Sequence, residues 1–146
     1  MHEILIDTCI LVDYFRYDKT ATKKHPERKL NSASARAFII DAAKHYQLTI
    51  SVITLKELLQ YPNISPKEEK RIVDNMLKVC NVLPVNLEVA KTAGLLCRNA
   101  AEYKGKHIED CYIAATAIVF NAPLYTRNPK DFNCVTHPNL IIKVPY

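Results

Sequence analysis

Glycine is scarce in this sequence, with Gly94 and Gly105 as the only two among 146 residues. Two glycines so far apart form neither G-x-G-x-x-G nor G-x-x-x-x-G-K-[ST], which excludes dinucleotide-binding and P-loop proteins. A haloacid-dehalogenase-type phosphatase requires D-x-D after its first strand, but this chain has Asp7-Thr8-Cys9 at that place. These absences exclude several common classes of phosphate-handling α/β proteins.

Long hydrophobic runs and paired cysteines are also absent. No apolar run reaches the roughly 18 residues that a membrane span requires. The N-terminus, residues 1–7, lacks the basic start and small-residue cleavage site of a signal peptide and is typical of a strand instead. The five cysteines are odd in number and include no C-x-x-C pair: Cys9, Cys80, Cys97, Cys111 and Cys134. This pattern favours reduced thiols in a cytoplasmic protein over a disulfide framework or a zinc site.

The composition is that of an ordinary globular protein. Hydrophobic residues make up 49% of the chain and charged residues 24%. A length of 146 residues is sufficient for one domain with a real hydrophobic core, so we expect a single domain over residues 1–146. The net charge of +5 is compatible with an anionic partner, although many basic proteins bind no nucleic acid.

Hydrophobic periodicity and capping signals predict an alternation of strands and helices. Strands are expected at 3–7, 48–53, 124–126 and 140–144, and residues 82–85 form either a short edge strand or none, because of Pro84. Helices are expected at 10–17, 34–46, from Thr54 to Pro62, from Ser65 to Cys80, at 87–102 and at 108–120. Strands separated by helical crossovers predict an α/β fold with a central, mostly parallel sheet and helices on both faces. In such sheets the functional site lies beyond the carboxyl ends of the strands.

Three acidic residues are expected at those ends. Asp7 terminates the first strand, Glu57 follows the second strand in the first turn of a helix, and Asp110 opens the apolar helix 108–120. A carboxylate beside buried apolar segments is costly unless a partner compensates its charge. A divalent cation is one such partner, and Mg²⁺ is typically held by a few carboxylate oxygens and retained waters.

Acidic residues alone suffice for one kind of chemistry. Hydrolysis of a phosphodiester needs a hydroxide near neutral pH and neutralisation of the charge that builds on the phosphate. One or two metal ions supply both, while carboxylates hold the metal. No serine, cysteine or histidine nucleophile is required, and a Cys111–His107 nucleophile pair lacks an orienting third group.

Two of the three acids, Glu57 and Asp110, also have a purely structural explanation. Glu57 stands in the T-x-x-E spacing of a capping box that begins at Thr54. Glu109 and Asp110 both favour a helix N-terminus through the helix dipole. Asp7 is harder to explain in this way, because an acid that ends a strand has fewer local structural roles. The order and setting of all three acids are more telling than any one of them.

Four sequence blocks together strongly resemble the PIN-domain nucleases, and most closely the VapC-type toxins of bacterial and archaeal toxin–antitoxin pairs. These blocks are ILIDT at 4–8, ITLKEL at 53–58, DCYIAATA at 110–117 and LYTRNPKDF at 124–132. The resemblance covers nearly the whole chain. It implies a PIN-like sheet, cleavage of RNA with Mg²⁺ or Mn²⁺, a homodimer, and inhibition by a small antitoxin protein inserted near the site.

The resemblance also assigns residues to the site. It implies that Asp7, Glu57 and Asp110 are the metal-binding, catalytic acids, with Thr8 and Thr126 as supporting hydroxyls. The fourth family position, often aspartate, falls on Asn128 here, which offers a carbonyl oxygen but no charge. Asp131 is the alternative fourth ligand, although an aspartate before Phe132 is equally a structural feature of the family. Cys9 replaces an asparagine that is frequent two residues after the first acid.

Several further features leave alternatives open. His107 is either a proton donor near Asp110 or an ordinary surface histidine, and Lys104 and Lys106 either meet phosphates or belong to a solvated loop. The basic residues of the aperiodic stretch 18–30 form either an RNA-gripping arm or a solvated loop: Lys19, Lys23, Lys24, Arg28 and Lys29. Two other functions also remain open: an RNA-processing PIN nuclease outside a toxin–antitoxin pair, and a weakly catalytic RNA- or protein-binding module, which Asn128 would favour.

Overall fold

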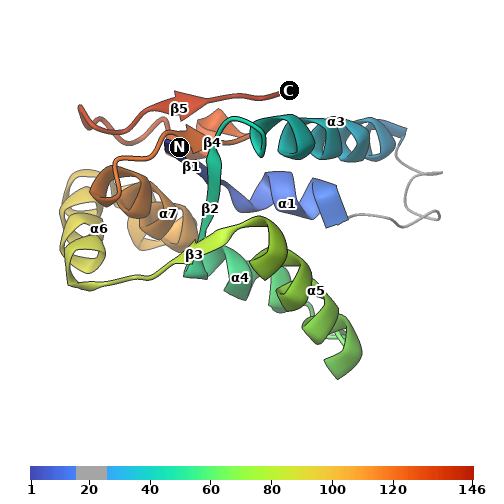
Figure 1. Ribbon diagram of the computed structural model, residues 1–146. Helices are drawn as coiled ribbons and strands as arrows, with labels where there is room; N and C mark the ends of the chain where they lie inside the picture. The colour runs from blue at the N-terminus through green and yellow to red at the C-terminus, as the bar shows by residue number, and fades with distance from the viewer. Residues whose placement is uncertain (16–25) are drawn as a thin grey trace.

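A computed structural model describes residues 1–15 and 26–146 of the chain. Within these residues the strands form one sheet in the order β3-β2-β1-β4-β5, and every neighbouring pair is parallel (Figure 1). Their bounds are β1 Glu3–Ile6, β2 Gln47–Ser51, β3 Asn81–Leu83, β4 Leu124–Tyr125 and β5 Ile142–Lys143. The expected α/β fold with a parallel sheet is therefore confirmed, and β3 is an edge strand, one of the two predicted alternatives.

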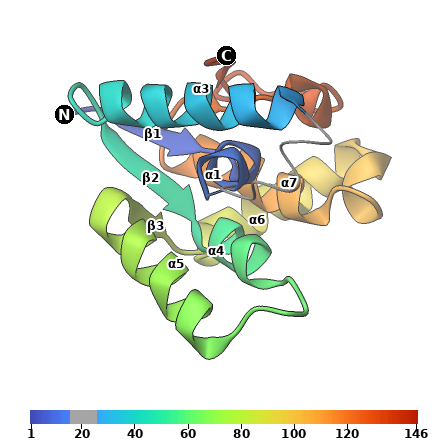
Figure 2. The same ribbon diagram turned by 90° about the vertical axis from the view of Figure 1, so that its right-hand side faces the viewer.

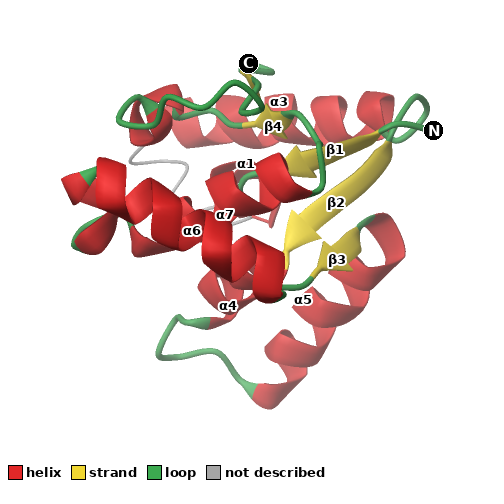
Figure 3. Ribbon diagram, turned by 90° about the vertical axis from the view of Figure 1, so that its left-hand side faces the viewer, coloured by secondary structure: helices red, strands yellow, loops and turns green. Residues whose placement is uncertain are grey.

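Helices cover both faces of this sheet. Helices α1 and α3 lie on one face and α6 and α7 on the other, while α4 and α5 lie toward the β3 edge (Figures 2 and 3). The α-helices are α1 Thr8–Phe15, α3 Pro26–Ala42, α4 Val52–Leu59, α5 Pro66–Val79, α6 Leu87–Asn99 and α7 Ile108–Val119. Two short 3₁₀ helices follow α6 and β4: η1 Ala101–Lys104 and η2 Pro129–Phe132. None of these described helices has both the length and the hydrophobicity to cross a membrane.

The sheet separates two hydrophobic cores, because successive side chains of a strand point to opposite faces. In β1, Ile4 and Ile6 belong to the core under α1 and α3, whereas Leu5 belongs to the core under α6 and α7. Helix α7 is buried along most of its length between the sheet and α6, as its nearly continuous apolar sequence predicted. Both faces of β1 are thus covered, and this strand is the rigid centre on which the following residues are placed.

Several helix boundaries differ from the prediction: α1 starts at Thr8 rather than Ile10, α6 ends at Asn99 rather than Glu102, and α3 and α4 differ more. Helix α3 starts at Pro26, eight residues before the predicted Ser34, and ends at Ala42 rather than Tyr46. Its first turns have no hydrophobic periodicity, because the buried residue there is the small, polar Ser32. Arg28 and Lys29 therefore belong to a helix, while the other basic residues of this stretch and the predicted end of helix 10–17 lie outside the described residues.

Helix α4 starts at Val52, not at the predicted capping box. Ser51 is its N-cap, and the Ser51 hydroxyl accepts a hydrogen bond of 3.1 Å from the backbone N–H of Ile53. The predicted start of α5 is confirmed, because Ser65 caps it by accepting from the backbone N–H of Glu68 at 3.2 Å. On α5, Met76 is completely buried, whereas its neighbour Leu77 is 61% exposed.

Candidate active site

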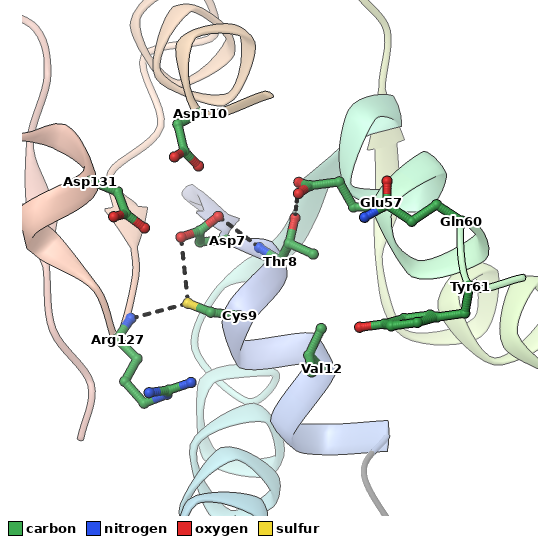
Figure 4. Close-up of a pocket in the computed structure, with 10 residues that line it drawn as sticks. All are labelled: Asp7, Thr8, Cys9, Val12, Glu57, Gln60, Tyr61, Asp110, Arg127 and Asp131. Carbon is green, nitrogen blue, oxygen red and sulfur yellow. Dashed lines mark hydrogen bonds between the residues drawn. The ribbon is translucent and has the colours of Figure 1, made fainter. Parts of the chain in front are cut away.

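An open pocket of about 370 Å³ lies at the carboxyl ends of the strands, where the sequence predicted the functional site. Strand β1 pairs with β2 on one side and with β4 on the other, so the chain order reverses at β1 and Asp7 follows at this switch point. Ten residues line the pocket (Figure 4): Asp7, Thr8, Cys9, Val12, Glu57, Gln60, Tyr61, Asp110, Arg127 and Asp131. The fold thus brings together acids that are far apart in the sequence.

Asp7 is the most buried acid of the pocket, with 3% of the residue exposed. Its Oδ1 accepts a hydrogen bond of 2.8 Å from the backbone N–H of Thr8, and its Oδ2 accepts one of 2.7 Å from the hydroxyl of Thr126. Burial raises the pKa of this carboxyl above its usual value, although these hydrogen bonds act in the opposite direction. Asp7 is therefore fixed in one orientation, and burial makes its ionised form costly unless a cation compensates the charge.

Cys9 adds a third, weaker contact to Asp7. Its Sγ donates to Asp7 Oδ2 at 3.4 Å and accepts from the backbone N–H of Arg127 at 3.4 Å. Burial and the nearby Asp7 carboxylate raise the pKa of the Cys9 thiol to about 12, so the thiol stays protonated near neutral pH. Cys9 is therefore a hydrogen-bond donor of the site rather than a nucleophile.

Glu57 reaches the pocket from the second turn of α4, one turn later than predicted. The Thr8 hydroxyl donates to Glu57 Oε1 at 2.7 Å and lies 3.0 Å from the hydroxyl of Thr54, which is fully buried. Burial and the neighbouring acids raise the pKa of Glu57. The capping-box explanation of Thr54 and Glu57 is therefore wrong, because both side chains are directed to Thr8 and Ser51 caps the helix instead.

Asp110 enters the pocket from the first turn of α7. Burial, with contributions from Asp7 and Asp131, raises its pKa to about 6, while a hydrogen bond from His107 opposes this shift. His107 Nδ1 lies 2.8 Å from Asp110 Oδ2, so His107 is a partner of the site rather than an ordinary surface histidine. The neighbouring Glu109 points elsewhere and forms a partly exposed ion pair of 3.0 Å with Lys56.

The two candidates for the fourth acidic position differ in placement. Asp131, in η2, lines the pocket and turns its carboxylate toward Asp7 and Asp110 (Figure 4). Asn128 is not among the lining residues, and its backbone N–H donates to the Thr126 hydroxyl at 3.0 Å. Oxygen or nitrogen ligand atoms of His107, Asp110 and Asp131 all lie within 4.8 Å of one another. The pocket thus has an aspartate in the region where the sequence alone pointed first to an asparagine.

Sequence reasoning missed a buried ion pair at the rim of the pocket. Arg127 Nε donates to Asp13 Oδ2 at 2.7 Å, and the hydroxyl of Tyr146 donates to the same oxygen at 2.8 Å. Asp13 lies on α1 and is only 2% exposed. No local sequence pattern predicts this ion pair, because Asp13 and Arg127 are separated by more than a hundred residues.

The donor set of the pocket suits a divalent cation. Four carboxylates converge, and the pKa values of Asp7, Glu57 and Asp110 are raised mainly by burial. Clustered carboxylates with this desolvation are stabilised by a cation, and hard divalent ions prefer oxygen ligands. A cysteine nucleophile is not supported, since Cys111 is buried against Cys97 and its pKa is raised to about 12.

A parallel sheet with an acidic pocket at its switch point defines an α/β protein whose site is suited to a divalent cation. The family is identified by the match of the PIN domain model to residues 4–136. The chain belongs to the PIN domain family, as its four sequence blocks predicted.

The chain is also similar to characterised and structurally solved proteins. It is 27% identical to "Ribonuclease VapC1" of Methanocaldococcus jannaschii over 132 residues, which are 89% of this chain and 79% of that protein. It is 26% identical to a chain in the crystal structure of VapBC2 from Rickettsia felis bound to a promoter DNA fragment, with a TM-score of 0.69 and coverage of 97% and 98%. A toxin–antitoxin complex from Klebsiella pneumoniae gives 28% identity, a TM-score of 0.65 and 98% coverage of both chains.

Proposed function

We propose that this protein is a metal-dependent endoribonuclease that hydrolyses RNA phosphodiester bonds as the toxin of a toxin–antitoxin pair. The observation that carries the proposal is the convergence of four carboxylates on one pocket at the switch point of the sheet. Membership of the PIN family and the similarity to a ribonuclease and to toxin–antitoxin complexes support it. The whole chain, residues 1–146, acts as one catalytic domain in this proposal.

Asp7, Glu57, Asp110 and Asp131 are the residues that would hold Mg²⁺ or Mn²⁺. A cation bound there supplies an activated water near neutral pH and neutralises the charge that builds on the phosphate. The chain's own residues hold the ligands in place: Thr8 and Thr126 fix the carboxylates of Glu57 and Asp7. Asn128 has a supporting role, because its backbone N–H holds the Thr126 hydroxyl.

Asp7 and Asp110 are the central catalytic acids of this proposal. Asp7 directly follows β1 and Asp110 lies in the first turn of α7, so a cation held by both would link the central strand to the helix that packs on it. Asn128 was the feature that favoured a weakly catalytic binding module. Because Asp131 lines the pocket, the pocket still has four acids despite the asparagine at position 128, which argues against that alternative. We therefore favour an active nuclease over a binding module.

The proposed partners follow from the similar proteins. RNA is the substrate, a small antitoxin protein covers the acidic pocket, and the chain forms a homodimer in the cytoplasm. The five cysteines, all within the described residues, are free thiols, which agrees with a reducing compartment. An RNA-processing enzyme outside a toxin–antitoxin pair would share the pocket but not the inhibitor.

The direct test is RNA cleavage by the purified protein. Total RNA is incubated with the wild-type chain and Mg²⁺ or Mn²⁺, and the 5′ ends of the products are mapped. Discrete internal cuts that require the cation and stop with EDTA are expected. The matched control is Asp7→Asn, which keeps the size of the side chain but removes its charge. Cleavage that persists in excess EDTA would contradict the mechanism.

A further inference from the structure

His107 stands at the start of α7, beside the acids but outside the oxygen-ligand set described above. Its Nδ1 lies 2.8 Å from Asp110 Oδ2, and the side chain is about one third exposed. A ring nitrogen of His107 and carboxylate oxygens of Asp110 and Asp131 all lie within 4.8 Å of one another. Ligands on opposite sides of a small divalent cation are about 4.2 Å apart. The separation of these three ligand atoms is therefore close to the separation of ligands around one such cation.

We propose that His107 is a nitrogen ligand of the cation, together with Asp110 and Asp131, and that it makes the site selective for a first-row transition metal such as Mn²⁺ over Mg²⁺. This inference rests on the proposed function, because it concerns the same metal site. Its physical basis is the donor chemistry. Mg²⁺ prefers oxygen ligands and retained waters, whereas imidazole is a good ligand for transition metals.

The charge of the pocket supports a neutral ligand at this place. Asp7, Glu57, Asp110 and Asp131 already supply four carboxylates around one cavity. Another acid would add repulsion, whereas the neutral imidazole adds a donor without adding negative charge. In the neutral ring one nitrogen carries the hydrogen and the other has a free lone pair, so Nδ1–H can donate to Asp110 Oδ2 while Nε2 binds the cation.

The competing role for His107 is that of a positioning residue, which orients Asp110 by a hydrogen bond without touching the metal. Such partners also matter for metal affinity, and their loss typically weakens binding by roughly 10- to 100-fold. The two roles differ in selectivity. A positioning residue affects Mg²⁺ and Mn²⁺ alike, whereas a nitrogen ligand affects mainly the transition metal.

Isothermal titration of the purified full chain with MnCl₂ and with MgCl₂ separates these roles. His107→Gln is compared with the wild type, and His45→Gln, an exposed histidine in the turn before β2, is the matched control. We expect His107→Gln to weaken Mn²⁺ binding by at least roughly tenfold and Mg²⁺ binding much less. His45→Gln should change neither affinity. An equal loss for both metals would overturn the proposal and leave His107 as a positioning residue.

Pulsed electron paramagnetic resonance of the Mn²⁺-loaded chain gives an independent signature. A directly bound imidazole produces a ¹⁴N coupling to Mn²⁺, which should be present in the wild type and in His45→Gln but absent in His107→Gln. Mn²⁺ binding without this coupling would overturn the histidine ligand and leave the proposed nuclease intact. A wild-type chain that binds neither metal would overturn both the ligand and the proposed metal site.

Discussion

Hydroxyl groups, rather than cationic side chains, hold the two acids nearest the sheet. Thr126 and Thr8 donate to Asp7 and Glu57, respectively, at 2.7 Å. A hydroxyl orients a carboxylate but does not neutralise it, and burial raises the pKa of both acids. The residues thus leave negative charge uncompensated at the place where a cation is proposed to bind.

Replacement of Asp110 by asparagine separates its proposed catalytic role from a structural one. Asp110→Asn keeps the size of the side chain and an oxygen that can accept from His107, but it removes the charge that a metal requires. We expect RNA cleavage to be lost at saturating Mg²⁺ or Mn²⁺. Full cleavage by a folded Asp110→Asn variant would exclude Asp110 from the site, whereas the helix-dipole role alone predicts retained activity and a destabilisation of at most about 1 kcal/mol.

The raised pKa of Asp110 predicts an unusual pH dependence for the metal-free protein. Between its unfolded value of 3.8 and its folded value of about 6, Asp110 is protonated mainly in the folded state. The folded state therefore binds more protons than the unfolded state in this window. As a result, the contribution of Asp110 to the free energy of unfolding is present at low pH and decreases as pH rises from about 3.8 through about 6. Asp110→Asn should raise the free energy of unfolding at pH 7 by about 1 kcal/mol, because solvent in the open pocket reduces the full shift. Urea unfolding in EDTA at pH 4.5 and pH 7 measures this, and equal effects at both pH values would contradict it.

The Asp13–Arg127 pair predicts a stability effect away from the acids. Arg127→Ala leaves the carboxylate of Asp13 buried without its cationic partner, although it still accepts a hydrogen bond from the Tyr146 hydroxyl. Loss of one partner of a buried pair costs roughly 3 kcal/mol. Asp13→Asn should cost less, since Arg127 is 31% exposed and can be solvated. Thermal unfolding of both variants and of the double variant gives the coupling, and equal effects of the two single changes would contradict this asymmetry.

At the scale of the helices and strands, patterns that repeat along the chain were predictable and long-range hydrogen bonds were not. The nearly continuous apolar sequence of α7 predicted its burial. The alternation of strands and helices predicted the parallel sheet and the position of Asp7 at the carboxyl ends of the strands. The start of α4 was mispredicted, because Thr54 forms its hydrogen bond with Thr8, 46 residues away, instead of capping a helix. The Asp13–Arg127 pair was missed for the same reason, and the sequence left the role of His107 open, since both sets of contacts form only in the folded chain.

Gly94 destabilises helix α6 without a packing role in the described structure. This glycine is exposed in the middle of the helix, and a Cβ atom added there would meet nothing within 4 Å. Glycine costs a helix roughly 0.5–1 kcal/mol relative to alanine, because it loses more backbone entropy on folding. Gly94→Ala should therefore raise the free energy of unfolding by about this amount in a urea titration. RNA cleavage should be unchanged, and a destabilised variant would indicate that this face of α6 packs against another chain.

For the molecule as a whole, the proposed toxin role predicts a defined phenotype in cells. Expression of the wild-type chain should arrest growth, and co-expression of the neighbouring antitoxin gene should relieve the arrest by covering the pocket. Asp7→Asn is the matched control, because it should be harmless while it still binds the antitoxin in a pull-down. Harmless expression of folded, catalytically active wild-type protein would favour an RNA-processing enzyme instead.

Metal binding should also stabilise the whole fold, because the acids lie directly after β1 and in α4, α7 and η2, and a shared cation would link these segments. A ligand that binds only the folded state adds about 2.7 kcal/mol at a concentration 100 times its Kd. For a chain of this size, that corresponds to a rise in Tm of roughly 5–10 °C. Differential scanning calorimetry in EDTA and in saturating Mn²⁺ measures the rise. Glu88→Gln, which removes an exposed acid on α6 that does not line the pocket, should keep the full shift. Asp110→Asn should lose most of it, since it removes a proposed ligand, and an undiminished shift in Asp110→Asn would mean that the cation stabilises the protein from a different site.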